Sequence, residues 1–244
     1  GIVLSSNYSL GFTGAALALV LYGLITLLFL RETLLRTPGT KSENLREQIR
    51  VYRQALSNKP FAHLTGAFTL MEICAALMWV LLAVYVKQNF GVAESSYSWI
   101  PTTNALMVVF LQVFITRALK PFRDTQVMPF GALFYVAAML IVGVSSQFWG
   151  FWLAMVVMTF GELITAPTAT AFVANLAPQD QRGRYLGLFG LTWHVAMAIG
   201  PFTAGILTDT YGIRSPWFAG AVVGALAVAA YALLDRRMSR SHSD

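Results

Sequence analysis

The sequence predicts an all-α membrane protein, a polytopic bundle of about seven transmembrane helices. Hydrophobic residues make up 57% of the chain and charged residues only 11%, whereas soluble domains carry about 25% charged residues. The mean hydropathy is +0.62. The apolar residues gather in seven runs of about 20 residues, the length that crosses the hydrocarbon core of a bilayer. These observations exclude an ordinary soluble domain.

The seven predicted spans follow one another closely, except after the first. The first run, residues 10–30, is too long for the apolar part of a signal peptide and has no basic residues before it. The only extended polar segment, residues 31–60, comes next, and its part 43–56 has the spacing of a helix lying on a membrane surface. The other spans are expected at about 61–86, 98–116, 127–144, 148–175, 185–208 and 216–234.

The basic residues predict the orientation of the chain. If the side of the 31–60 segment is called inside, 15 of the 17 Lys and Arg residues fall on that side, and only Lys87 and Arg214 fall outside. Cytoplasmic loops carry such an excess of basic residues. The N-terminus of this chain is therefore expected outside the cell and the C-terminus in the cytoplasm. The loops account for the net charge of +6, so no nucleic-acid partner is expected.

Polar side chains within the spans mark the candidate functional residues. An ionisable group at the centre of a bilayer costs about 2.5–3.5 kcal/mol on insertion scales, so such groups usually have a function. The candidates are Glu72 in the second span, Asn104 and Gln112 in the third, Glu162 in the fifth and His194 in the sixth. The first, fourth and seventh spans have no comparable residue. We therefore expect these three at the rim and the others along an aqueous path, a period typical of repeat-built transporters.

Depth in the membrane suggests that three of these residues form one site. At 1.5 Å per residue, Glu72, Glu162 and His194 lie roughly 13–21 Å from a membrane face, near the middle of the core. We expect a shared proton-handling site with Glu162 as its first candidate, because it precedes a helix bend expected at Pro167 by about one turn. Structural alternatives stay open. Glu72 could pair with His194, and the two amides could be contacts between helices.

The segment 161–214 carries the clearest motifs of the chain. They are Gly161-Glu162 followed by Pro167, an Ala-Pro and Arg-Gly-Arg-Tyr loop, and Gly200-Pro201 followed by Gly205 and Asp209. This segment resembles helices ten to twelve of major facilitator superfamily transporters, most of all bacterial drug:proton antiporters. The loop ITRALKPFRD departs from the family pattern, because it keeps the basic residues of a Gly–Asp–Arg–Gly–Arg signature but not the glycines.

The resemblance covers the chain as helices six to twelve of that family. It implies that residues 1–30 are the last helix of an N-terminal half, 31–60 a cytoplasmic basic linker and 61–244 the C-terminal six-helix half, with helices one to five absent here. It also implies proton-coupled efflux of a small molecule by alternating access in the cell membrane. The expected partners are the lipid bilayer, the substrate, protons and the N-terminal half, and Pro167, Gly200 and Pro201 are expected hinge or packing positions.

Other polytopic membrane proteins are the alternatives to a transporter. A seven-helix receptor, or another non-transporting membrane protein, shares the span count and the orientation. A retinal protein does not fit, because the last span has no lysine. The sequence lacks His-x-x-x-His, Gly-x-Ser-x-Gly and a phosphate-cradling glycine loop. We therefore expect no enzyme activity, no catalytic residues, no metal site and no cofactor.

Overall fold

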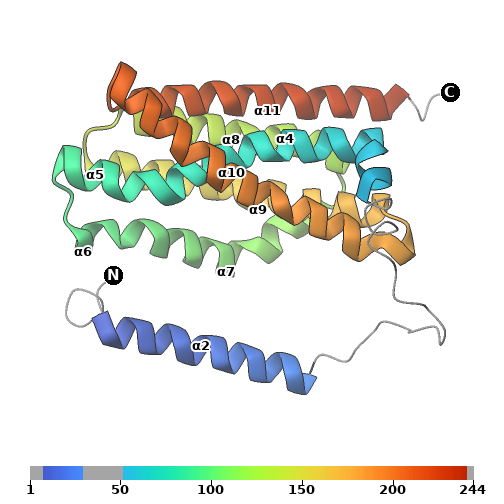
Figure 1. Cartoon of the computed structure of the whole chain (residues 1–244), viewed down its shortest axis with the longest axis horizontal. Coiled ribbons are helices and arrows are strands. Elements are labelled where there is room, and N and C mark those ends of the chain that lie inside the picture. The colour runs from blue at the N-terminus through green and yellow to red at the C-terminus, as the bar shows by residue number, and fades with distance from the viewer. Residues whose placement is uncertain (1–7, 30–51, 241–244) are drawn as a thin grey trace. The chain divides into compact units, whose positions relative to one another are not determined.

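The computed structural model describes residues 8–29 and 52–240, and every regular element in these ranges is a helix. The chain divides into two compact units, Gly1–Val51 and Tyr52–Asp244. The first contains helix α2, Tyr8–Phe29 (Figure 1), which confirms the first predicted span. The linker predicted at 31–60 lies largely outside the described residues, so the boundaries at residues 30 and 60 stay predictions.

The second unit is a bundle of six long spans (Figure 1). Its elements are α4 (Lys59–Ala76), η1 (Leu77–Leu81), α5 (Leu82–Phe90), α6 (Glu94–Tyr97), α7 (Trp99–Leu119), α8 (Asp124–Val144), α9 (Phe148–Leu176), η2 (Gln179–Gln181), α10 (Arg182–Tyr211) and α11 (Ser215–Arg240). All six remaining predicted spans are confirmed. The helices extend beyond the predicted ends, because apolar composition marks only the part of a helix that lies in hydrocarbon.

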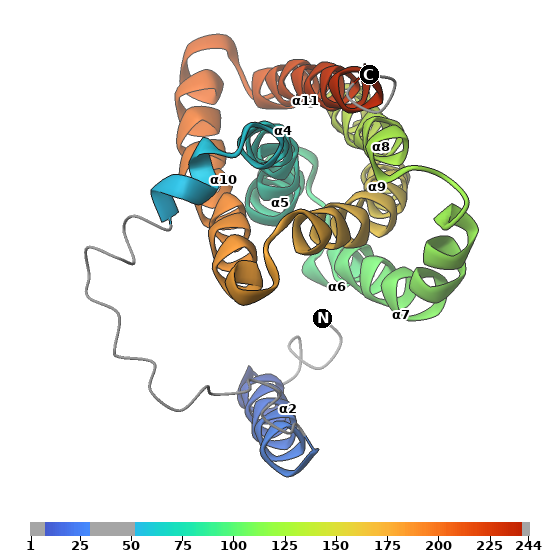
Figure 2. The ribbon, with the colours of Figure 1, turned by 90° about the vertical axis from the view of Figure 1, so that its right-hand side faces the viewer.

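The packing of the bundle interleaves its two three-helix groups. Helix α7 packs on α9, α10 packs on α4, and α8 lies along both α9 and α11, as the view along the helices shows (Figure 2). If α4, α7 and α8 are matched with α9, α10 and α11, the α7–α9 contact corresponds to the α10–α4 contact. The α8–α9 contact then corresponds to a contact between α11 and α4, and the α8–α11 contact corresponds to itself. The pairing is the one that a two-fold relation between two three-helix repeats would produce.

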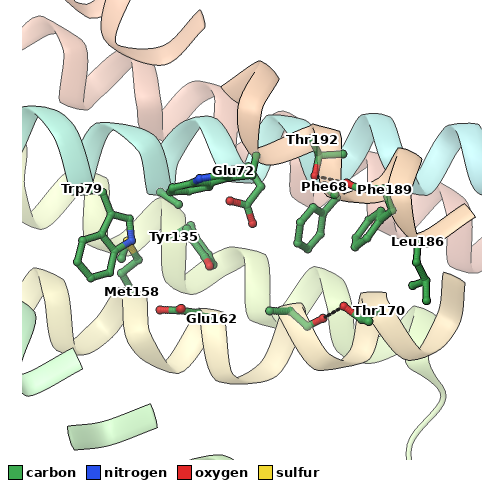
Figure 3. A pocket seen from close by; sticks show the side chains of 14 residues that line it. Phe68, Glu72, Trp79, Tyr135, Met158, Glu162, Thr170, Leu186, Phe189 and Thr192 are labelled. Carbon is green, nitrogen blue, oxygen red and sulfur yellow. Dashed lines mark hydrogen bonds between the residues drawn. The ribbon is translucent and has the colours of Figure 1, made fainter. Parts of the chain in front are cut away.

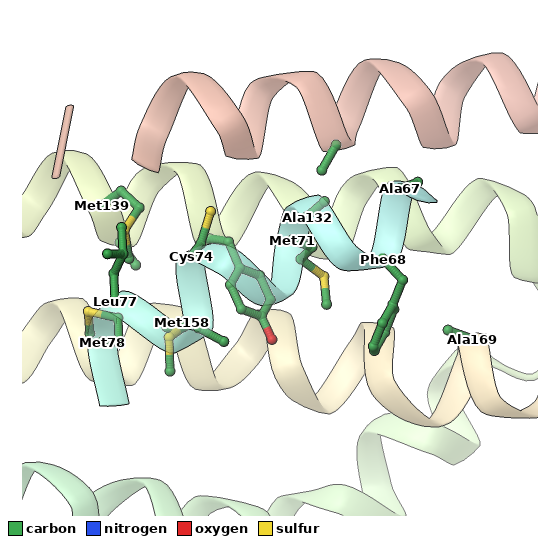
Figure 4. Close-up of a cluster of buried hydrophobic side chains, with 14 of the residues drawn as sticks. Ala67, Phe68, Met71, Cys74, Leu77, Met78, Ala132, Met139, Met158 and Ala169 are labelled. Carbon is green, nitrogen blue, oxygen red and sulfur yellow. The ribbon is translucent and has the colours of Figure 1, made fainter. Parts of the chain in front are cut away.

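Methionine and small residues fill the centre of the bundle. Met71, Cys74 and Met78 of the α4–η1 span are buried in this core (Figure 4). The thiol of Cys74 donates to the Gly220 carbonyl of α11 at 3.3 Å. Unbranched methionine side chains fit irregular gaps between helices. A Cβ at Gly200 would lie 3.3 Å from the Cβ of Ala76, which supports the packing role expected there, between α10 and α4.

A pair of glycines brings α8 and α9 into close contact. A Cβ at Gly161 would lie 2.8 Å from the carbonyl oxygen of Gly131 and equally near the ring of Tyr135. A Cβ at Gly131 would lie 2.5 Å from the Cγ2 of Thr165. Since real Cβ contacts are not that short, only glycine allows this approach. The crossing places Tyr135 directly beside Glu162, the residue that follows Gly161.

Candidate functional site

A cavity of about 640 Å³ lies between α4, α8, α9 and α10 (Figure 3). Its walls are Phe68, Glu72, Ala75, Trp79, Tyr135, Met158, Glu162, Ala166, Thr170, Leu186, Phe189, Gly190, Thr192 and Trp193. Binding sites for small molecules are usually apolar hollows of this size with a few polar groups. Two of the five polar residues singled out in the sequence, Glu72 and Glu162, line the cavity.

The two carboxyl groups face the cavity from opposite helices. Glu72 comes from α4 and Glu162 from α9, and Figure 3 shows Tyr135 of α8 between them. Both glutamates are half-buried, whereas the tyrosine is buried. Two carboxylates that share a poorly hydrated space repel each other, so the pair favours the uptake of a proton or another cation. The arrangement is suited to exchanging one positive charge for another.

Aromatic side chains form much of the remaining wall. The rings of Phe68 and Phe189 pack with their centroids 4.5 Å apart, joining α4 to α10. Trp79 lies in η1, a π-helical turn within the second span, and such turns are frequent at functional sites. Aromatic faces attract cations as well as apolar groups. The cavity therefore combines negative charge with surfaces that fit an amphipathic molecule.

Asn104 and Gln112 lie behind α9, outside the cavity wall. Asn104 is buried, and its Nδ2 donates to Glu162 Oε2 at 2.8 Å and to Thr159 Oγ1 at 3.0 Å. The Nε2 of Gln112 donates to the Leu163 carbonyl at 3.2 Å and to Thr116 Oγ1 at 3.0 Å. The structural alternative raised for both residues therefore describes their contacts, and Asn104 in addition orients the candidate carboxyl group.

His194 does not join the two glutamates. It is exposed on α10, does not line the cavity, and its Nδ1 lies 3.3 Å from the Gly190 carbonyl of its own helix. The expected three-residue site is therefore wrong for this cavity. Depth gives the position of a residue along a helix but not around it, and each residue turns the side chain by 100°. Thr192 and Trp193 take the cavity face of α10 instead.

Tyr135 is one of the site residues that sequence reasoning missed. None of the cavity-lining residues belongs to α11, but α8 contributes Tyr135, so the expectation that the fourth span stays at the rim is wrong at this position. The span was classed as plain because tyrosine was not counted among the polar types. The Gly131 and Gly161 crossing brings α8 close enough for this ring to reach the cavity.

No group of three or more His, Cys, Asp or Glu side chains that could hold a metal ion occurs within residues 8–29 and 52–240. The chemistry available to the described site is that of its two carboxyl groups, the tyrosine hydroxyl and the aromatic wall.

The match of this sequence to known families decides the class of protein. The sequence profile of the Major Facilitator Superfamily matches residues 64–244, most of the chain.

The chain belongs to the Major Facilitator Superfamily. A solved structure of a mutant peptide transporter POT in complex with alafosfalin shares the fold, with a TM-score of 0.63 and 13% identity over 80% of this chain and 42% of that one. With its seven apolar helices, this member of the superfamily is a multi-pass membrane protein. The all-α membrane protein with seven spans expected from the sequence is confirmed.

Curated relatives in the superfamily include transporters of different kinds. The chain is 27% identical to the uncharacterized MFS-type transporter YttB of Bacillus subtilis, over 72% of this chain and 44% of the relative. It is 29% identical to a Na(+), Li(+), K(+)/H(+) antiporter of Planococcus maritimus, over 64% and 40%. It is 26% identical to the puromycin resistance protein pur8 of Streptomyces alboniger, over 64% and 32%. The chain thus spans less than half the length of these relatives.

Proposed function

We propose that this chain is part of a secondary active transporter that exports a small molecule in exchange for protons by alternating access. The observation that carries the proposal is the pair Glu72 and Glu162 in one cavity of about 640 Å³ inside a membrane-spanning bundle. Ionisable residues at such depth usually mark a substrate or ion path. The names of two relatives, a cation/proton antiporter and a puromycin resistance protein, support exchange and efflux.

In this proposal, protons and substrate compete for the carboxyl groups. Glu162 is the first candidate for coupling, because Asn104 orients it and it faces the cavity. When the cavity opens to the side of low proton concentration, a carboxylate releases its proton and can attract a cationic or polar substrate group. When it opens to the other side, a proton displaces that group. His194 has no part in this exchange, because it lies outside the cavity.

The proposed substrate has an apolar, partly aromatic body and a neutral or cationic polar group. The size of the cavity is within the usual range of roughly 300–1,000 Å³ for small-molecule sites. Phe68, Trp79 and Phe189 supply flat apolar surfaces. Because two carboxylates face the same space, an anionic substrate would be repelled.

The proposed location is the cell membrane, with the N-terminus of this chain outside and the C-terminus in the cytoplasm. In support, the α7–α8 connection, the η2 turn and the end of α11 lie at one end of the second unit (Figure 1), and they carry Arg117, Lys120, Arg123, Arg182 and the basic tail. The end of α5, which contains Lys87, and the α10–α11 connection, which contains Arg214, lie at the other end (Figure 1). This is the distribution expected of cytoplasmic and outer loops.

An N-terminal half is the proposed partner of this bundle. Exposed apolar residues cover α7 and α10, for example Val109, Phe110 and Phe114 on α7 and Phe202 and Ile206 on α10. In repeat-built transporters the substrate site lies between parts that rock against each other. We therefore propose that the 244-residue chain alone does not transport, and that purified chain in vesicles takes up no substrate.

The experiment uses the protein encoded by the complete reading frame that contains this sequence, reconstituted in vesicles with a proton gradient. Puromycin, ethidium and Na⁺ are the probes, and proton flux is followed with a pH-sensitive dye. Glu162→Gln is expected to abolish probe-dependent proton flux while leaving membrane insertion intact, and Glu72→Gln to reduce it strongly. The control His194→Gln, a titratable residue outside the cavity, should transport normally. Unchanged proton-driven transport in both glutamate variants would contradict the proposal.

A further inference from the structure

A side chain from α7 supplies a hydrogen bond that a proline removes from the backbone of α9. Pro167 has no N–H group, so the carbonyl of Leu163, four residues earlier, lacks its usual helical donor. The Nε2 of Gln112 lies 3.2 Å from that carbonyl and donates to it. A neighbouring helix thus supplies the hydrogen bond that the proline removes, which is one way a membrane helix tolerates proline.

Within residues 52–240, such a replacement hydrogen bond is found at the proline of α9 and not at those inside α8 and α10. Prolines also lie within α8 and α10, at Pro129 and Pro201, and leave the carbonyls of Thr125 and Met197 without their usual donors. Among the hydrogen bonds of residues 52–240, no side chain donates to either of these two carbonyls. Gln112 therefore links the segment of α9 around Pro167 to α7.

The residues around Pro167 favour bending of α9 at this point. The hydroxyl groups of Thr165, Thr168 and Thr170 each donate to the carbonyl four residues earlier, at 2.8, 2.6 and 2.8 Å. Such bonds compete with the helical ladder and often bend helices. A second cavity, of about 250 Å³, lies beside Pro167 and is also lined by Thr116 of α7. The C-terminal part of α9 therefore has room to move.

Another polar contact between α7 and α9 ends on Glu162, the residue before Leu163. Asn104 donates to the carboxyl group of Glu162 at 2.8 Å, next to Leu163. A hydrogen bond to an ionised carboxylate is about twice as strong as one between neutral groups. Protonation of Glu162 therefore weakens the contact at Asn104, whereas the contact at Gln112 involves no titratable group.

We propose that Asn104 and Gln112 are positioning residues, a polar clamp through which α7 holds the Pro167 bend of α9 and senses the protonation of Glu162. Proton uptake weakens one arm of the clamp, so the bend changes more easily. The Gln112 arm of the clamp, its bond to the Leu163 carbonyl, is argued from the geometry alone. The Asn104 arm responds to protons, and this part rests on the proposed function, in which Glu162 takes up and releases protons.

The groups that face Glu162 from the neighbouring helices determine which titration the clamp follows. Glu72 of α4 and Tyr135 of α8 share its cavity. The lining residues of α10 include no titratable group, and α7 contributes the neutral amide of Asn104. Glu72 is the one other carboxyl group at the described cavity, so Glu72→Gln serves as the control for its influence on the pH response.

The first test measures hydrogen–deuterium exchange of residues 164–176 in the protein from the complete reading frame, in lipid nanodiscs. Gln112→Leu should raise exchange of this segment about threefold, the effect of an average hydrogen bond in a membrane helix bundle. Thr116→Val, which removes only the other partner of Gln112, should behave as wild type. In a Pro167→Ala background the amide at position 167 can donate to the Leu163 carbonyl, so adding Gln112→Leu should have no further effect. An equal effect in both backgrounds, or none in either, would overturn the Gln112 arm.

The second test follows the same exchange at pH 5.5 and pH 8, each corrected for the intrinsic rate. The wild type and Glu72→Gln should exchange faster at the lower pH, while Glu162→Gln should show the faster rate at both. A pH response that persists in Glu162→Gln would overturn the proton-sensing arm. The readout does not require transport. If the clamp behaves as expected while Glu162→Gln and Glu72→Gln both still support proton-coupled transport, the proposed function fails and the clamp stands.

Discussion

Helices α7 and α8 both pack along α9, but they are held in different ways. Helix α8 is held by close apolar packing, because Gly131 and Gly161 let the two backbones approach closely and ten of its residues are buried. Helix α7 buries only Ile100 and Asn104. Its contacts with α9 include hydrogen bonds from Trp152, Asn104 and Gln112. One interface is insensitive to protons, whereas the other includes a titratable carboxyl group.

Helices α7 and α8 therefore have different roles in the bundle. Close apolar packing has the same strength at any pH, so α8 provides α9 with a fixed support. Hydrogen bonds between membrane helices contribute only about 0.6 kcal/mol on average. Breaking and re-forming the bonds between α7 and α9 therefore costs little free energy. A transporter needs both properties, because some helices must keep the site intact while others move around it.

The largest effect is expected from a bulky side chain at the closely packed interface between α8 and α9. Gly161→Val places a Cβ 2.8 Å from the Gly131 carbonyl and adds two methyl groups against Tyr135. We expect a loss of stability of about 3 kcal/mol or more, the upper part of the range for overpacking. Thermal unfolding of the purified protein in detergent measures it. Gly187→Ala, where a Cβ meets no atom within 4 Å, is the control, and similar melting temperatures of both variants would contradict the account.

An intermediate effect is expected at the charged contact of α7. Asn104→Leu removes the donors to Glu162 and Thr159, at a cost of about 1–2 kcal/mol in stability. A carboxylate without its donor holds a proton more readily, so the pH midpoint of transport should move to higher pH. Thr159→Val keeps the contact with Glu162 and should leave the midpoint in place. A midpoint that stays unchanged in Asn104→Leu would remove the link between α7 and the carboxyl group.

The smallest effect is expected at the neutral contact near the start of α7. Trp152→Phe removes the donor of the 2.9 Å bond to Thr103 Oγ1 but keeps an aromatic ring. We expect about 0.6 kcal/mol in stability and no change in the pH dependence of transport, because neither partner titrates. A shift of the pH midpoint in this variant would show that any loosening of α7 has that effect, and would weaken the distinction between its contacts.

Much of the fold could be predicted from the sequence, because the bilayer imposes a length and an apolar composition on every span. The starts and ends of the apolar runs lie within a few residues of the helices. The likeness of segment 161–214 to helices ten to twelve agrees with the family match over residues 64–244. Residues 30–51 fall outside the described part, so the linker stays a prediction.

The site was predicted in part. Glu72 and Glu162 could be found because a carboxyl group in hydrocarbon stands out in any apolar run. His194 was grouped with them wrongly, since depth alone does not give the direction of a side chain around its helix. Tyr135 and the role of Gln112 could not be found, because each depends on the distance between two helices. The Leu163 carbonyl needs a donor only because of Pro167, and nothing in the sequence identifies Gln112 as its neighbour.

The central claim is that Glu72 and Glu162 exchange protons for substrate, and proton release on binding tests it most directly. The purified protein from the complete reading frame, in weakly buffered detergent at neutral pH, is mixed with whichever of puromycin, ethidium or Na⁺ it transports. We predict that binding to the wild type releases protons into solution, that Glu162→Gln releases fewer, and that Glu72→Gln/Glu162→Gln releases none. Equal proton release by the wild type and the double variant would contradict the account.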